Sequence, residues 1–187
     1  GVRLVHFPHN DASALDRALR RCSSARKKLV VCDGVYSAGG QAANLRDIAA
    51  VAHAHRALVY VDDAHGIGVL GGNPTRAAPY GYGGGGTPLH QNVRSRNVVH
   101  AGSLSKAFSI PLAFVAGTSR VMAQLRDRSA TLVHCSPPAL PMVAAALVAL
   151  RVNEREGDIR RRHLIDRVRQ LRHGLELQHT GHDRLLG

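Results

Sequence analysis

The sequence predicts an α/β fold with a mostly parallel sheet and flanking helices. Three short apolar segments, at residues 29–32, 57–61 and 97–100, have the length and composition of buried parallel strands. One segment with the apolar spacing of a helix precedes residues 29–32. Another lies between residues 29–32 and 57–61. Because strands and helices that alternate in this way imply right-handed crossovers, we expect these strands side by side in one sheet.

The first elements are expected as follows. Residues 3–7 form a short strand, and Asn10 or Asp11 caps a helix. The apolar face of this helix consists of Leu15, Ala18, Leu19 and Cys22. Asn44 caps a second helix, and Asp47 lies near its positive end.

The later elements are a strand and two helices. Residues 112–116 are expected to form another buried strand. An apolar helix from Pro141 to about Arg155 is expected to be buried against the sheet or a second subunit. Asp158 then begins a separate amphipathic helix. Its apolar residues are spaced by four, three and four positions: Leu164, Val168, Leu171 and Leu175.

Length and composition indicate a folded chain. The 187 residues are 44% hydrophobic, which excludes a disordered protein. No apolar run approaches the roughly 18 residues that a membrane span needs, and the first residues show no signal-peptide pattern. Three cysteines without CxxC spacing indicate neither a disulfide framework nor a zinc site. We therefore expect a soluble, cytoplasmic protein with no membrane partner.

The formal net charge of +12 raises the question of nucleic-acid binding. The densest basic run, residues 160–172, falls on the outer face of one amphipathic helix, and tryptophan is absent. Few aromatic side chains are available to stack on bases. We expect a solvated helix face and no specific nucleic-acid partner.

Functional groups follow the carboxyl ends of the predicted strands. Ser37 follows the strand at 29–32, Asp62 and His65 follow the next, and Ser103 and Lys106 follow the strand at 97–100. In a parallel sheet, ligands bind at this edge. A lysine, an acid, an imidazole and hydroxyls are the groups that a pyridoxal-phosphate site requires. The sequence therefore points to this cofactor.

Lysine is scarce in this chain, and Lys106 stands out among its three lysines. Lys27 and Lys28 lie in a polar run, whereas small and apolar residues flank Lys106. We expect these neighbours to bury most of the Lys106 stem. A buried ammonium group loses hydration, which favours the neutral, nucleophilic amine.

Two motifs carry a resemblance to a known family. Residues 61–71, VDDAHGIGVLG, followed by residues 103–108, SLSKAF, resemble the fold-type-I pyridoxal-phosphate enzymes of the class I/II aminotransferase superfamily. Within that superfamily the chain is most similar to the alpha-oxoamine synthase group, which includes 8-amino-7-oxononanoate synthase. Residues 7–11 and 33–37 fit the same group in order and spacing.

The resemblance implies a role for each site residue. Asp62 would pair with the pyridine nitrogen, while His65 and Ser37 would contact the ring hydroxyl. Ser103 would donate to the phosphate. Lys106 would bind the cofactor covalently and then act as acid and base at the substrate α-carbon.

The resemblance also implies an activity and partners. It favours an acyl-CoA:amino acid C-acyltransferase, with a class I/II aminotransferase and a truncated, non-catalytic relative as alternatives. The substrates would be an amino acid and an acyl-CoA. The full-length form would be a homodimer in which Ser136 reaches the phosphate of the partner subunit.

The chain resembles the middle of such an enzyme. Residues 1–150 would be part of the large cofactor-binding domain, and residues 151–187 would be a connecting helix and the start of the small domain. Asp33 stands where the family usually has glutamate, and Ser109 stands where it generally has glycine. The glycine-rich stretch 76–92 lacks GxGxxG spacing and is expected to be a mobile loop.

Two other enzyme classes fit less well. Residues 103–106 form an S-x-x-K motif, as in penicillin-binding acyl-enzymes with Ser103 as nucleophile, but S-D-N and K-T-G motifs are absent. His53 and His55 lie two residues apart on a helix and point to different sides. We therefore expect no metal site.

Overall fold

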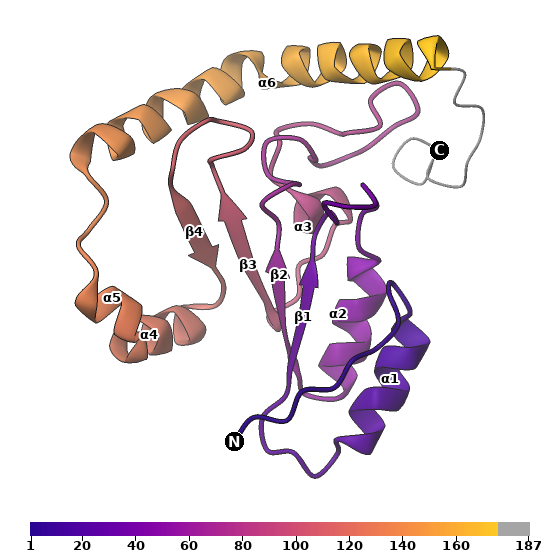
Figure 1. Ribbon diagram of the computed structural model, residues 1–187, viewed down its shortest axis with the longest axis vertical. Coiled ribbons are helices and arrows are strands. Elements are labelled where there is room, and N and C mark those ends of the chain that lie inside the picture. Colours follow the sequence, from indigo (N-terminus) through magenta and orange to yellow (C-terminus); the bar gives the residue numbers. More distant parts are fainter. Residues whose placement is uncertain (176–187) are drawn as a thin grey trace.

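A computed structural model describes residues 1–175 of the chain. The strands are β1 (Leu29–Asp33), β2 (Leu58–Asp62), β3 (Val98–Ser103) and β4 (Ala113–Ala116). The helices are α1 (Ala12–Arg21), α2 (Leu45–Ala54), α3 (Thr87–His90), α4 (Ser119–Arg128), α5 (Ala130–His134) and α6 (Leu140–Gly174). The sheet has the order β1-β2-β3-β4, with β1 to β3 parallel and β4 antiparallel (Figure 1). The predicted α/β class is confirmed.

Helices α1 and α2 cover one face of the sheet. The Asp11 carboxylate accepts a hydrogen bond from the Ala14 backbone N–H (2.7 Å), which confirms it as the cap of α1. The main core lies between these helices and β1 and β2. Its members include Leu15, Leu19, Val30, Leu45, Ile48, Val59 and Val61.

The face of β1 opposite α1 and α2 is uncovered, so the prediction that this strand is buried is wrong for that face. Leu29 and Val31 of β1 are each 60% exposed, because α1 and α2 pack on the opposite side. The predicted strand at residues 3–7 is also wrong. That segment forms no ladder with β1, whose only partner in the four-stranded sheet is β2.

Helix α6 is one continuous helix of 35 residues, where the sequence predicted two. The single Gly157 does not interrupt it. This glycine is buried, and a side chain there would overlap Asn153 and Arg161, so glycine permits a close approach. The apolar half of α6 is not buried against the sheet, because Leu147 is 55% and Val148 57% exposed, so burial against a second subunit stays a prediction. Within residues 1–175, no helix combines the length and apolar character needed to cross a bilayer.

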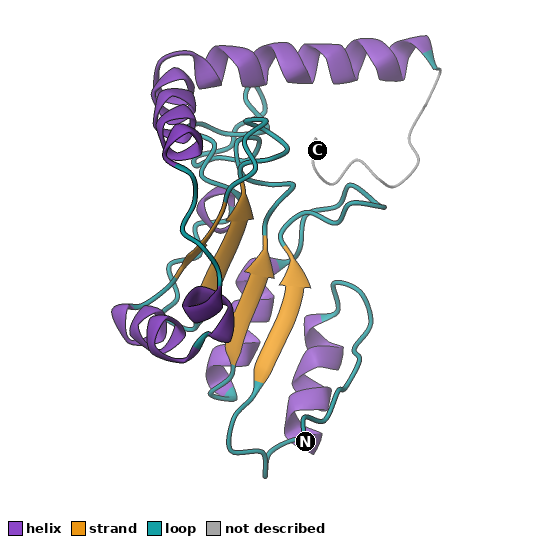
Figure 2. Cartoon of the chain, turned by 60° about the vertical axis from the view of Figure 1, so that its left-hand side comes forward, coloured by secondary structure: helices purple, strands orange, loops and turns teal. Residues whose placement is uncertain are grey.

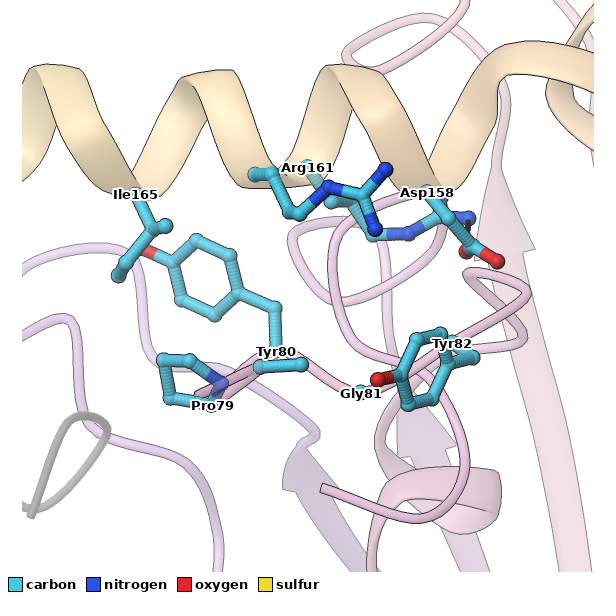
Figure 3. A pocket seen from close by; sticks show the side chains of 9 residues that line it. Pro79, Tyr80, Gly81, Tyr82, Asp158, Arg161 and Ile165 are labelled. Atoms are coloured by element: carbon cyan, nitrogen blue, oxygen red, sulfur yellow. Dashed lines mark hydrogen bonds and ion pairs between the residues drawn. The ribbon is translucent and has the colours of Figure 1, made fainter. Parts of the chain in front are cut away.

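The glycine-rich loop, predicted to be mobile, forms hydrogen bonds to α6. The Gly83 N–H donates to Asp158 (2.9 Å), and the Asn153 amide donates to the Gly83 carbonyl (3.0 Å). Arg161 is buried and donates to the Gly68 carbonyl (2.9 Å). Figure 3 shows Asp158 and Arg161 of α6 above the loop, with the Tyr80 ring beside Ile165. We call this contact between α6 and residues 68–84 the α6 clamp.

We expect Asp158, a member of the α6 clamp, to make a pH-dependent contribution to stability. The hydrogen bonds from Arg161 and from Gly83 lower the pKa of Asp158 from its ordinary value of 3.8. A lowered folded-state pKa gives stability that is present above the ordinary value and is lost as the pH falls through the folded-state value. Because the Asp158 side chain is 44% exposed, solvent screening limits this contribution to about 0.5–1 kcal/mol.

Asp158→Asn is therefore expected to lower the free energy of unfolding by about 0.5–1 kcal/mol near pH 7. The difference from the wild type should shrink as the pH falls below 3.8. Urea denaturation at several pH values measures it. The matched control is Asp166→Asn, since Asp166 forms a longer, exposed pair with Arg169 (3.4 Å) and should show a smaller difference. An Asp158→Asn difference that does not change with pH would contradict this assignment.

Candidate active site

The carboxyl ends of the three parallel strands lie in register. Asp33 of β1 is opposite Asp62 of β2, and Asp62 is opposite Ala101 of β3. The turns that follow β1, β2 and β3 therefore emerge at one edge of the sheet, the edge that faces α6 (Figure 2). This is the edge at which the sequence placed the functional residues.

At this edge the structure brings Lys106 and His65 together. The Lys106 Nζ atom lies 2.8 Å from the His65 Nε2 atom, although 41 residues separate them. His65 lies on a turn closed by hydrogen bonds from Gly66 and Ile67 to the Asp63 carbonyl (both 3.0 Å). A primary amine and an imidazole in hydrogen-bond contact can exchange a proton.

Lys106 is exposed, so the prediction that its stem is buried is wrong. The reason is the turn after β3. Its apolar members Leu104 and Ile110 point into a small core with Ala146 of α6, whereas Lys106 lies between them on the open side. Neighbours in sequence therefore pack inward and leave the lysine accessible.

Ser103 is the last residue of β3, directly before the turn that carries Lys106. Its hydroxyl is 2.7 Å from the Ser105 hydroxyl and accepts a hydrogen bond from the Ser105 N–H (3.2 Å). Ser109, where the family generally has glycine, has a φ of 56°. This left-handed conformation is one that glycine adopts without strain, so the backbone keeps the shape that the family resemblance implies.

Asp62 and Ser37 lie at the same edge, and within residues 1–175 neither forms a hydrogen bond or ion pair with Lys106. Asp62 is exposed, and its carboxylate accepts a hydrogen bond from the Ala64 N–H (3.1 Å). Ser37 is exposed in the turn after β1, next to Tyr36. The Tyr36 ring packs against His9 with centroids 4.2 Å apart, and burial raises the pKa of Tyr36 to about 12. This packing restrains the turn that carries Ser37.

Ser136 is also exposed, but it lies elsewhere. It belongs to the segment between α5 and α6, at the far side of β4 in Figure 1. Within residues 1–175, no contact joins Ser136 to the turns of Lys106 or His65. Its assignment to a partner subunit stays a prediction.

The sequence reasoning did not single out Asp63. Its carboxylate is fully buried and accepts hydrogen bonds from the Thr87 N–H and the Thr87 hydroxyl (both 2.7 Å). His100 Nε2 of β3 lies 3.0 Å from the same carboxylate. A signal was present, because adjacent residues at a strand end point to opposite faces of the sheet, so Asp62 and Asp63 are expected in different surroundings.

A cavity adjoins the lysine turn. It has a volume of about 480 Å³ and lies between α6 and the residues that follow Lys106. Apolar side chains dominate its lining: Val69, Ala107, Phe108, Ala149, Val152 and Leu164. Arg160 and Asn153 are among its polar members. The site therefore combines an exposed primary amine with an apolar space.

Curated relatives share much of this chain. It is 38% identical over 174 residues to the 8-amino-7-oxononanoate synthase of Alcanivorax borkumensis, covering 93% of this chain and 42% of the relative. The same enzyme of Burkholderia mallei is 38% identical over 175 residues, covering 92% and 41%. The chain thus spans about two fifths of the length of these relatives.

Solved structures have the same fold. A serine palmitoyltransferase of Sphingomonas wittichii superposes with a TM-score of 0.80 at 30% identity, over 94% of this chain and 41% of that one. A serine palmitoyltransferase variant from S. paucimobilis with bound PLP and myriocin has a TM-score of 0.79 at 29% identity, over 94% and 43%. An 8-amino-7-oxononanoate synthase of Francisella tularensis has a TM-score of 0.61 at 23% identity, over 80% and 40%, and supports the fold alone.

A family model covers nearly the entire chain. The model "Aminotransferase class I and II" matches residues 1–184. This match agrees with the parallel sheet, with the Lys106–His65 contact and with the relatives above. The resemblance seen in the sequence is confirmed, and the chain belongs to the class I and II aminotransferase family.

Proposed function

We propose that this chain is the cofactor-binding part of a pyridoxal-phosphate-dependent transferase that acts on an amino acid. The observation that carries the proposal is the 2.8 Å contact between Lys106 and His65 at the carboxyl edge of a parallel sheet. Relatives and neighbours of the chain include 8-amino-7-oxononanoate synthases and a serine palmitoyltransferase with bound PLP.

The donor set of this edge fits the cofactor. The Lys106 amine and the Asp62 carboxylate are both exposed, so they are accessible to a ligand. Asp62 would hold a proton on the pyridine nitrogen, and His65 with Ser37 would hydrogen-bond the ring hydroxyl. Ser103 would contact the phosphate. Pyridoxal phosphate, when bound, withdraws electrons from the α-carbon of an amino acid.

Residues of this chain would then transfer the proton of the substrate α-carbon. Lys106 would bind the cofactor and, once released by substrate, hold or return the proton at the α-carbon. His65 would accept or donate the proton of the Lys106 amine, with which it is in contact. The apolar cavity next to Ala107 and Phe108 supports an acyl chain as the second substrate.

The proposed overall reaction is a condensation of an amino acid with an acyl-CoA. A carbon–carbon bond forms between the α-carbon and the acyl carbon, and the carbon–sulfur bond breaks. The carboxylate leaves as CO₂, one proton is taken up, and free CoA thiol is released. Transamination instead exchanges an amino group with a 2-oxo acid and releases no thiol, so thiol release separates the two activities.

Three further proposals concern the environment of the chain. A homodimer is supported by the exposed apolar residues of α6, such as Leu140 at 83% exposure, which a second copy could cover. A cytoplasmic location is supported by three free cysteines, Cys22, Cys32 and Cys135. The division at residue 150 stays a prediction, and α6 runs through it.

The test incubates the purified chain with pyridoxal phosphate, acetyl-CoA or palmitoyl-CoA, and glycine, alanine or serine. A thiol reagent follows CoA release. Release that requires both the cofactor and an amino acid supports the proposal. Amino transfer to a 2-oxo acid without thiol release supports the aminotransferase alternative. If neither reaction is observed, whether or not the cofactor is retained, the proposed activity of this chain is overturned. That result supports the non-catalytic relative.

A further inference from the structure

The buried carboxylate of Asp63 has no part in the proposed chemistry, yet it is the most enclosed charged group near the site. Its side chain is 0% exposed. Burying a charge is unfavourable unless hydrogen bonds compensate for lost hydration. Here the Thr87 N–H, the Thr87 hydroxyl and His100 provide three contacts of 2.7, 2.7 and 3.0 Å. We call Asp63, Thr87 and His100 the Asp63 network.

The Asp63 network joins the two segments that carry His65 and Lys106. The Asp63 carbonyl accepts the two hydrogen bonds that close the His65 turn, and its N–H donates to the Ala101 carbonyl of β3 (2.8 Å). Its side chain contacts His100, also on β3. Since β3 leads directly into the turn that carries Lys106, Asp63 contacts both the His65 turn and the strand that positions the Lys106 turn.

Three glycines pack against the same carboxylate. A methyl group added at Gly34, Gly66 or Gly86 would overlap the Asp63 side chain. Gly34 begins the turn that carries Ser37, and Gly66 follows His65. The turns of the proposed site therefore meet at Asp63, and a shift of its side chain displaces them together.

We propose that Asp63 is a positioning residue that holds His65 against Lys106 and thereby sets the reactivity of the Lys106 amine. The inference rests on the proposed function, in which this amine is the nucleophile. An imidazole at 2.8 Å can take the proton of the amine. An imidazole displaced by about 1 Å loses much of that assistance.

The reactivity of Lys106 can be measured without any cofactor. Trace acetic anhydride acetylates amines in the folded chain, and mass spectrometry compares Lys106 with Lys27 as an internal reference. Because proton transfer contributes about 10²- to 10⁴-fold to reactions of this kind, we expect Asp63→Asn to lower the Lys106:Lys27 labelling ratio at least about 10-fold. Thr87→Val, which removes one hydroxyl, should lower it in the same direction.

Two variants control for a general loss of structure. Thr87→Ser keeps the hydroxyl and should keep the wild-type ratio. Asn97→Ala removes hydrogen bonds to the Ala49 and Ala57 carbonyls (3.3 and 3.1 Å), before β3 and away from the Asp63 network. It should lower stability while leaving the ratio unchanged. Circular dichroism and urea denaturation confirm that each variant is folded under the labelling conditions.

The decisive comparison is a double-mutant cycle with His65→Phe. If Asp63 acts through His65, Asp63→Asn combined with His65→Phe is no less reactive at Lys106 than His65→Phe alone. The inference is wrong if the effects of Asp63→Asn and His65→Phe on the Lys106:Lys27 labelling ratio multiply. It is also wrong if Asp63→Asn has the wild-type ratio. Failure of the proposed function would appear differently, as wild-type chain that labels normally but neither retains pyridoxal phosphate nor releases CoA.

Discussion

Lys106→Ala is expected to abolish covalent attachment of pyridoxal phosphate to this chain. The reason is positional. Lys27 and Lys28 precede β1 and lie at the amino end of the sheet, whereas Lys106 lies at the carboxyl edge beside His65. Among the lysines of residues 1–175, only Lys106 has an imidazole within 2.8 Å, with a carboxylate and hydroxyls on neighbouring turns. Borohydride treatment after incubation with the cofactor makes the link permanent, and peptide mass spectrometry identifies the modified lysine.

The control for this experiment is the double variant Lys27→Ala, Lys28→Ala. It removes every other lysine of the chain, leaving the α-amino group as the remaining amine apart from Lys106. It should bind as much cofactor as the wild type, with all of it on Lys106. Retention of covalently bound cofactor by Lys106→Ala, or modification mapped to Lys27 or Lys28, would remove the basis of the proposed site.

Gly86→Ala is expected to lower the free energy of unfolding by about 3 kcal/mol or more. Gly86 has a φ of 89° and a ψ of −176°, a conformation almost confined to glycine. A side chain there costs about 1–3 kcal/mol in backbone strain. The added methyl group would also overlap the buried Asp63 carboxylate. Overpacking of this kind costs a further ~1–3 kcal/mol.

A glycine series separates the two effects. Gly83 has a φ of 81°, but an added methyl group meets nothing within 4 Å, so Gly83→Ala should cost only about 1 kcal/mol from strain. Gly39→Ala has neither problem and should be nearly neutral. Urea denaturation of the three variants measures the differences. Equal losses for Gly86→Ala and Gly83→Ala would show that overlap with Asp63 contributes nothing.

Much of the fold was predictable because it depends on short-range patterns. The cap of α1 at Asp11 and the apolar face containing Leu15 and Leu19 are both encoded within about ten residues. The strands β1, β2 and β3 were recognisable as short apolar runs. The parallel pairing of β1 and β2 followed from the helix between them, since crossover connections have a preferred hand.

The meeting of Lys106 and His65 was predictable for a different reason. Each follows a parallel strand, and the carboxyl ends of such strands share one edge. The sequence motifs supplied the identities of the two residues, and the topology supplied their proximity. The position of Ser136 relative to Lys106 did not follow in this way, because Ser136 lies in an irregular segment between α5 and α6 and not at the end of a parallel strand.

Burial was the property that sequence reasoning predicted least well. Lys106 was expected to be buried and is exposed, as are Leu29 and Val31 of β1. An apolar segment indicates that its side chains favour burial, but it does not indicate which element of the fold covers them. Asp63 shows the converse, since a charged residue became the most enclosed group at the site through partners 24 and 37 residues away.

By itself, the sequence determined the α/β class, the parallel strands, the family and the identity of the lysine and histidine, because these depend on local periodicity and on motifs. Tertiary structure alone decided that Lys106 is accessible, that α6 is a single helix clamped to the glycine-rich loop, and that Asp63 holds the site turns together. The physical reason is that exposure and hydrogen-bond partners are properties of surfaces brought together by the fold, and residues far apart in the chain supply them.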